Sequence, residues 1–198
     1  MNITFQTAVE DDSLVIADMI NSASGGVVDF LFHDLIPGMT PAQMIAFSLK
    51  EDKNYHTYKN AITATCDNKI IGMIMSYSSE FQYIDEETRA FVPRDRIEHI
   101  KDIYESRVDN SLFIDALFVD SKFRNRNIGM NLLMSAKDKA INNYFKSLSL
   151  IVLSDNIAAI KLYEKFGFKI TKNVDIKPCE LIPHEGGGYL MECKLINS

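Results

Sequence analysis

The sequence predicts an α+β fold in which helices pack on a mixed β-sheet. Residues 111–119 and 148–153 read as apolar strands, and each precedes a segment with apolar residues at helical spacing. Two strands joined by a helix in this way run parallel, with a right-handed crossover. Earlier in the chain, two further apolar segments flank the turn residues Asp67-Asn68-Lys69, which predicts an antiparallel hairpin. The sheet is therefore expected to contain both kinds of pairing.

Composition restricts the class of protein. The chain has 198 residues, of which 46% are hydrophobic, and this suits one globular domain over residues 1–198. The net charge is −6, which argues against nucleic-acid binding, because such binding needs a basic face. Three cysteines without a CxxC spacing predict neither a disulfide framework nor a metal site. The N-terminus has no signal-peptide pattern, and no apolar stretch approaches the roughly 18 residues of a membrane span, so a cytoplasmic protein with no membrane partner is expected.

The first segments combine one strand, one helix and a long loop. Residues 3–8 alternate like a short strand, and Asp11-Asp12 can cap the helix that follows. Residues 22–39 contain two adjacent glycines and a Pro-Gly pair, so they are expected to form a shaped loop.

Two later segments differ in how clearly they are marked. Thr40, Pro41 and Gln43 form a capping-box start for a helix. Residues 81–110 are polar by contrast, and they are expected to be an inserted helix or loop between strands, with a helix beginning near Pro93. The helix that begins at Thr40 is therefore predicted from its capping residues, whereas residues 81–110 are interpreted mainly from their composition.

The C-terminal half is more regular. The helix after the first parallel strand has apolar residues at helical spacing, namely Leu132, Leu133, Ala136, Ala140, Ile141 and Tyr144. The next helix is expected to be capped by Ser154 or Asp155 and to end at Gly167. Residues 168–170 and 188–196 are expected to complete the sheet as antiparallel strands.

An anion site is predicted where the strand at residues 111–119 turns into a helix. Arg124 and Arg126 stand at this turn in an otherwise acidic protein. Helix N-termini expose unpaired N–H groups, and open α/β sheets bind ligands beyond the carboxyl ends of their strands. The turn lacks the glycines of a P-loop or a dinucleotide site, which disfavours nucleoside triphosphates and NAD. Solvated surface arginines are the alternative interpretation.

Two segments carry a resemblance to a known family. "LFVDSKFRNRNIGMNLL" resembles the acetyl-CoA signature R/Q-x-x-G-x-G/A of the GNAT superfamily of N-acetyltransferases, with Arg124, Asn127 and Gly129 at its three positions. Asn127 replaces the usual Gly, and Asn is the other residue that tolerates a left-handed backbone. "LSDNIAAIKLYEKFGFK" resembles the motif N-x-x-A-x-x-x-Y-x-x-x-G-F, and its matching residues are Asn156, Ala159, Tyr163, Gly167 and Phe168. The resemblance is firm over residues 111–168 and loose over 24–60 and 81–110.

The resemblance implies a three-layer fold. Its central sheet is mostly antiparallel, with one parallel strand pair splayed at the acetyl-CoA site and helices on both faces. Acetyl-CoA is implied as cosubstrate, and no metal is implied. The residues expected to bind acetyl-CoA are Leu117, Phe118, Val119, Arg124, Asn125, Arg126, Asn127, Ile128, Gly129, Met130, Asn156, Ala159 and Tyr163.

The implied reaction is direct transfer of an acetyl group to an amine. Tyr163 is expected near the thioester sulfur, where it would protonate the leaving thiolate; a core aromatic is the alternative. Asp115 is the candidate general base, because a carboxylate within an apolar strand is costly unless it is paired or functional; a salt bridge is the alternative. Strand alternation is expected to place Asp115, Leu117 and Val119 on one face. Glu80 is the reserve base, and the four histidines show no metal-ligand spacing.

The acceptor is left open by the sequence. A polyamine, an aminoglycoside, an amino acid or a protein amino group would each fit, and a homodimer is also left open. The acidic residues Asp29, Asp34, Asp85, Glu86 and Glu87 suit a cationic acceptor or a solvated surface equally. A non-catalytic module that senses coenzyme A or a small ligand is the alternative function. Asn127 favours that module, whereas the intact Asn156 and Tyr163 favour an enzyme.

Overall fold

The computed structural model describes residues 2–51 and 55–195, which contain a seven-stranded sheet. The strand order is β1-β2-β3-β4-β5-β7-β6, and within the described residues β4 and β5 form the one parallel pair. The mixed α+β sheet predicted from the sequence is thereby confirmed. The strands are β1 (Ile3–Thr7), β2 (Ala61–Cys66), β3 (Lys69–Ser78), β4 (Ser111–Val119), β5 (Ser147–Leu153), β6 (Lys169–Val174) and β7 (Gly188–Lys194).

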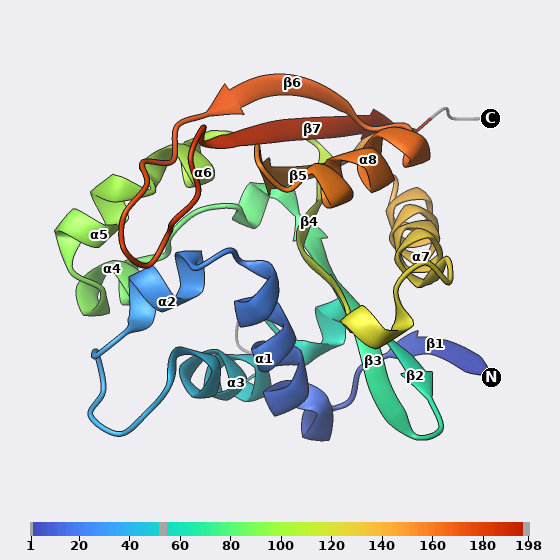
Figure 1. Ribbon diagram of the computed structural model, residues 1–198, viewed down its shortest axis with the longest axis horizontal. Coiled ribbons are helices and arrows are strands. Elements are labelled where there is room, and N and C mark those ends of the chain that lie inside the picture. Colours follow the sequence, from blue (N-terminus) through green and yellow to red (C-terminus); the bar gives the residue numbers. More distant parts are fainter. Residues whose placement is uncertain (1, 52–54, 196–198) are drawn as a thin grey trace.

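Helices cover both faces of the sheet and make three layers (Figure 1). On one face lie α7 and α8, and on the other α1 and α3 cover β3 and β4. Beside them, α2 and the short helices α4 to α6 gather next to the loop between β6 and β7. The α-helices are α1 (Ser13–Ala23), α2 (Val27–Phe32), α3 (Pro41–Glu51), α4 (Glu86–Phe91), α5 (Arg94–His99), α6 (Lys101–Glu105), α7 (Ile128–Asn142) and α8 (Ile157–Phe166).

Three of the local signals at turns and helix ends are confirmed. Asp67 and Asn68 both have a positive φ, of 48° and 61°, as a two-residue hairpin turn requires. Thr40 and Gln43 exchange the two hydrogen bonds of a capping box, at 2.9 and 3.2 Å. Gly167 ends α8 in the left-handed conformation, with φ of 115°.

Three sequence-based assignments are corrected. Residues 22–39 contain the helix α2 rather than only a loop. Val28 and Leu31 pack against apolar residues that are distant in the sequence, so the local pattern does not predict this helix. The N-cap of α8 is Asn156 instead of Ser154 or Asp155. In α7, Ile141 is half-exposed, and Tyr144 lies beyond the helix end and is 90% exposed, so neither belongs to the core.

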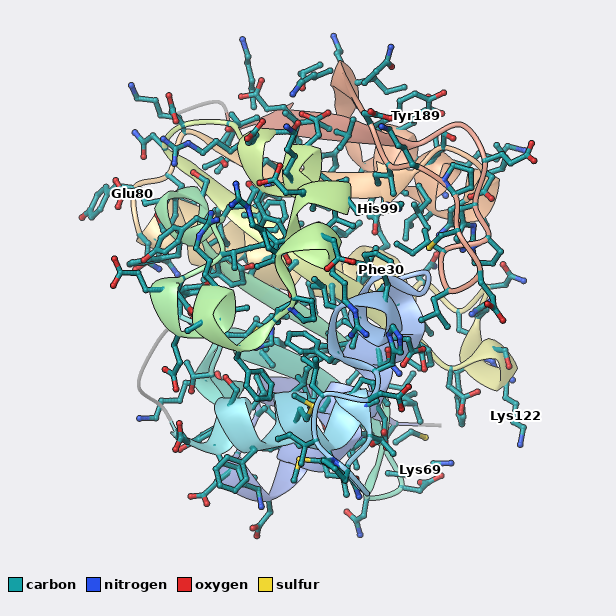
Figure 2. The ribbon with its side chains drawn as sticks, turned by 90° about the vertical axis from the view of Figure 1, so that its left-hand side faces the viewer. Phe30, Lys69, Glu80, His99, Lys122 and Tyr189 are labelled. Atoms are coloured by element: carbon teal, nitrogen blue, oxygen red, sulfur yellow. The ribbon has the colours of Figure 1, made fainter. Side chains whose placement is uncertain are left out.

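The polar segment at residues 81–110 folds as three short helices packed against α2 and the C-terminal strands. Pro93 is the N-cap of α5, as the sequence indicates, but the helix is interrupted at Ile100. The rings of Phe30 in α2 and His99 in α5 lie 4.7 Å apart between centroids (Figure 2). These contacts hold the segment over the same face of the sheet as α1 and α3.

The parallel strands β4 and β5 pair for only part of their length. Their register runs from Ser111↔Ser147 to Ile114↔Leu150, although β4 continues to Val119. Beyond Ile114 the two strands diverge, so one edge of β4 lacks a partner strand there. The same point carries a bulge, because Ser76 pairs with Ile114 while Met75 pairs with Ala116. Asp115 is the extra residue.

Candidate active site

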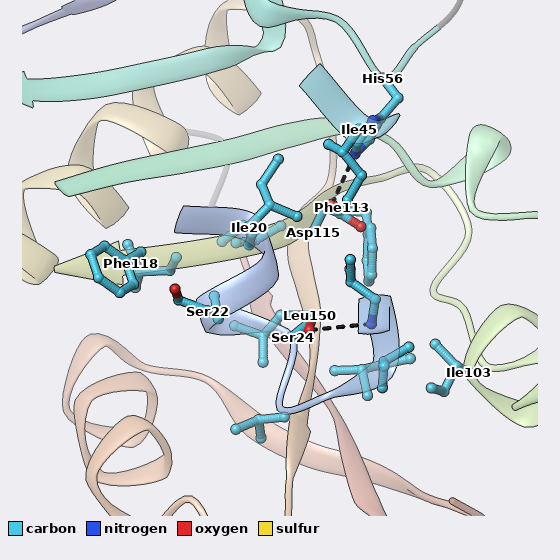
Figure 3. Close-up of a pocket in the computed structure, with 18 of the residues that line it drawn as sticks. Ile20, Ser22, Ser24, Ile45, His56, Ile103, Phe113, Asp115, Phe118 and Leu150 are labelled. Carbon is cyan, nitrogen blue, oxygen red and sulfur yellow. Dashed lines mark hydrogen bonds and ion pairs between the residues drawn. The ribbon is translucent and has the colours of Figure 1, made fainter. Parts of the chain in front are cut away.

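A cavity of about 1140 Å³ opens where β4 and β5 diverge. Its walls come from the turn before α7, from α8, from α1 to α3 and from α4 to α6. Figure 3 shows Asp115 and His56 facing each other in this cavity, with Phe113 beside them and Phe118 farther along β4. The cavity therefore runs from the predicted acetyl-CoA residues to the predicted base.

The turn before α7 presents backbone N–H groups to the cavity. Asn127 is the N-cap with φ of 60°, so it adopts the left-handed conformation that the usual Gly would provide. Its side chain makes no capping hydrogen bond, and the first helical bond joins Asn131 N–H to the Asn127 carbonyl. The N–H groups of Ile128, Gly129 and Met130 thus precede the helical ladder. Such groups, with the helix dipole, favour phosphate.

The two arginines of the turn lie in different environments. Arg124 lines the cavity, and its Nε donates a hydrogen bond to the Val119 carbonyl at 3.2 Å. Arg126 is not among the lining residues, and its guanidinium lies 5.8 Å from the centroid of the Phe123 ring. Of the pair, Arg124 is therefore the one aimed at a ligand in the cavity.

The unpaired edge of β4 offers further hydrogen-bonding groups. Asp120 N–H bonds the Ile71 carbonyl on β3, so alternation along the strand directs the backbone of Leu117 and Val119 away from β3. The Arg124 bond to the Val119 carbonyl agrees with this direction. The backbone of β4 can therefore pair with an extended ligand lying between the strands.

Gly129 lies where α7 meets α8, and it lines the cavity. A Cβ atom there would lie 3.1 Å from Cδ2 of Leu162 and 3.9 Å from Cγ2 of Val119. The glycine therefore also serves the packing of the two helices, in addition to leaving its backbone open to a ligand.

The predicted residues of α8 reach the cavity in different ways. Asn156 caps the helix, since its Oδ1 accepts from Ala159 N–H at 3.2 Å, and its amide NH₂ is left to donate. Tyr163 is only 8% exposed, and its ring packs edge-on against Phe168 at 5.7 Å. Burial raises the pKa of Tyr163 above its ordinary value, so the hydroxyl keeps its proton at neutral pH. Within the described residues, no protein group hydrogen bonds that hydroxyl.

Asp115 makes two contacts, whose partners the sequence did not identify. Its Oδ1 accepts from the Tyr77 hydroxyl at 2.9 Å, and its Oδ2 lies 3.5 Å from Nε2 of His56. The expectation that Asp115 shares a face with Leu117 and Val119 is wrong. The bulge reverses the alternation, so Asp115 lies on the Tyr77 side, while the other two pack toward α7.

Aromatic side chains surround this carboxylate. The ring of Tyr55 lies 4.8 Å from that of Tyr77 and stacks on Phe81 at 5.4 Å. The Tyr55 hydroxyl donates to the Tyr83 carbonyl at 2.9 Å, which ties this cluster to the segment before α4. Glu80, the reserve base, is exposed at the edge of the molecule and does not line the cavity (Figure 2).

Residues 2–51 and 55–195 contain no group of three or more His, Cys, Asp or Glu side chains that could hold a metal ion. In the same residues, no helix has the length and apolar character to cross a lipid bilayer.

Comparison with known proteins identifies relatives of this chain. Residues 29–168 match the model of the Acetyltransferase (GNAT) family. The fold matches that of an N-acetyltransferase from Staphylococcus aureus Mu50, with TM-score 0.69 and 22% identity over 96% of this chain and 99% of that one. It also matches Ard1 from Thermoplasma volcanium, with TM-score 0.63 and 16% identity over 100% of both chains. A third match is the PaiA N-acetyltransferase from Thermoplasma acidophilum in complex with coenzyme A. Its TM-score is 0.56, and its sequence identity is 14% over 98% of this chain and 100% of that one. At these identities the structures establish a shared fold.

Proposed function

Because the chain belongs to the Acetyltransferase (GNAT) family, we propose that it transfers an acetyl group from acetyl-CoA to a primary amine by direct attack in a ternary complex. One observation carries this proposal. The first residues of α7, the unpaired edge of β4, Tyr163 and Asp115 all line one cavity. Cofactor and acceptor can therefore meet between β4 and β5, where proximity supplies much of the acceleration.

The cofactor lies along the parallel strand pair in this proposal. Its pyrophosphate occupies the N-terminus of α7 near Arg124, where N–H groups and a guanidinium favour an anion. The amides of its extended arm pair with the backbone of Leu117 and Val119, and the Asn156 amide donates to it. These contacts orient the thioester toward Asp115.

His56, together with Asp115, removes the proton from the amine. An ammonium ion cannot attack a carbonyl, so its proton must leave first. A histidine imidazole is better matched than a carboxylate to accept a proton at neutral pH, and an adjacent carboxylate stabilises the imidazolium that forms. The 3.5 Å separation of His56 and Asp115 supports this division of roles. Asp115, predicted as the base, then acts with a partner.

The thiolate leaves as the carbon–sulfur bond of the tetrahedral intermediate breaks. The amine nitrogen has by then formed its bond to the carbonyl carbon, and the Tyr163 hydroxyl donates a hydrogen bond to the developing negative sulfur. Burial raises the pKa of Tyr163 further above that of a thiol, which disfavours complete transfer of its proton to the sulfur; a tyrosine that does give up its proton takes one back from water. The hydrogen bond itself stabilises the transition state.

A module that binds coenzyme A without turnover is the competing proposal. Asn127 was the feature in its favour, but the residue keeps the left-handed turn that Gly would make. Release of free thiol from acetyl-CoA in the presence of a panel of amines separates the two functions. Amine-dependent release supports the enzyme, and coenzyme A binding without release supports the module.

A further inference from the structure

We propose that the acceptor is an amine with a second positively charged group on an alkyl frame, as in a diamine or polyamine, and that Asp85 with the surrounding tyrosines holds the second charge. This inference rests on the proposed acetyltransferase function. It goes beyond that function because it names the class of acceptor.

Charge is distributed unequally between the two ends of the cavity. The carboxylates among its lining residues are Glu51, Asp85, Glu87 and Asp115. All four come from α3, the α4 region and β4, away from the turn that precedes α7. The basic Lys and Arg side chains among the described lining residues are Arg124, in that turn, and Lys165, in α8. The basic end thus suits the phosphates of coenzyme A, and the acidic end suits a cation.

Asp85 acts on the same tyrosines as Asp115. Burial, then the charge of Asp85, then that of Asp115 raise the pKa of Tyr55. Burial, Asp115, Tyr55 and Asp85, in that order, raise the pKa of Tyr104. Both carboxylates line the cavity together with Tyr55 and Tyr104, which come from different parts of the chain. Aromatic faces combined with carboxylates are the groups that bind alkylammonium ions.

The mouth of the cavity is apolar as well as acidic. The apolar lining residues that remain exposed are Phe47 (65%), Phe91 (45%), Tyr83 (45%) and Ile36 (36%). Exposed aromatic and aliphatic side chains around a cavity indicate contact with an alkyl frame. Because the charged side chains at this end include Glu51, Asp85, Glu87 and Asp115 and no described lining Lys or Arg, a carboxylate on the acceptor would face like charges there. A free amino acid is therefore disfavoured.

Three acceptors of matched length test the inference. Thiol release from acetyl-CoA is followed with cadaverine, with pentylamine, and with aminovalerate, whose far end is a carboxylate. Cadaverine is expected to exceed pentylamine in kcat/KM by about tenfold or more, and aminovalerate is expected to be the poorest. Equal values for cadaverine and pentylamine would overturn the inference while the acetyltransferase function stands. Absence of thiol release with every amine would overturn both.

Asp85→Asn tests the assigned residue without removing its structural role. Oδ1 of Asp85 caps α4 by accepting from Thr88 N–H at 2.7 Å, and Asn is an equally good N-cap. The variant is expected to reduce the preference for cadaverine over pentylamine at least about threefold, mainly through KM. Glu86→Gln removes a neighbouring exposed charge that does not line the cavity, so it is the matched control. An undiminished preference in Asp85→Asn, or an equal loss in Glu86→Gln, contradicts the inference.

Discussion

The carboxylate of Asp115 lies 3.5 Å from Nε2 of His56, although the two residues come from a central strand and from the residues that precede β2. The bulge at Asp115 makes this contact, because it turns the side chain toward α1 and α3. A carboxylate that would otherwise face α7 is thereby delivered to the acceptor end of the cavity. The pair forms the centre of the proposed proton transfer.

Replacing His56 by Gln is expected to lower kcat by about 10²-fold, because general-base catalysis is typically worth 10²–10⁴-fold. The loss should shrink as pH rises and more of the amine is deprotonated in solution. Steady-state kinetics against pH measure both effects. His99→Gln is the control, since His99 bonds the Lys177 carbonyl outside the cavity. A pH-independent loss, or an equal loss in both variants, would mean that His56 is not the base.

Tyr163→Phe is expected to lower kcat at least about tenfold, with the affinity for acetyl-CoA and the Tm little changed. The substitution removes only the hydroxyl and leaves the ring packed on Phe168. Tyr189→Phe, on β7 and outside the cavity, is the control and should keep full activity. Full activity in Tyr163→Phe indicates that water protonates the sulfur. Parallel losses of stability and activity indicate a core aromatic.

Arg124→Gln is expected to weaken coenzyme A binding about tenfold, since a charge-assisted contact with phosphate is lost. Arg126→Gln is the matched change two residues away, outside the cavity, and should weaken binding less than about threefold. Isothermal titration with coenzyme A measures both. A larger loss in Arg126→Gln than in Arg124→Gln would reverse the assignment of the two arginines.

The environment of Lys139 predicts how the free energy of unfolding depends on pH. Its Nζ donates to the Ser76 carbonyl at 2.6 Å and to Asn60 Oδ1 at 3.0 Å, beneath the bulge. Burial lowers the pKa of Lys139 from 10.5 to about 8. Between these values the unfolded chain binds more protons than the folded chain, so the free energy of unfolding rises with pH across this window.

Lys139→Met is expected to remove that rise, as measured by urea denaturation at several pH values between about 8 and 10.5. Lys137→Met, which changes an exposed lysine of the same helix, is expected to keep it. If the free energy of unfolding rises with pH equally in wild type and Lys139→Met, Lys139 is not the titrating group.

Much of the fold was predictable because its signals are local. Turn residues such as Asp67 and Asn68, the capping box at Thr40 and the stop at Gly167 each act within a few residues. The short helix α2 was missed because it depends on partners far along the chain. Ser154, Asp155 and Asn156 are all good caps, so propensity alone does not choose among them.

The two ends of the candidate site differed in how far they could be predicted. The acetyl-CoA end is built from one continuous turn and one helix, and most of its predicted residues line the cavity. The acceptor end assembles His56, Tyr77 and Asp115 from three separate segments. Their sequence spacing carries no periodic signal, and the bulge that joins them is invisible to a count of alternating residues.

The most direct test is to measure free coenzyme A and acetylated amine together, from acetyl-CoA and cadaverine, by thiol assay and mass spectrometry. Both products are expected to form in equal amounts, and only when protein and amine are present. Stabilisation of the fold by coenzyme A with no acetylated amine from any primary amine would contradict it, and would favour a binding module on the same fold.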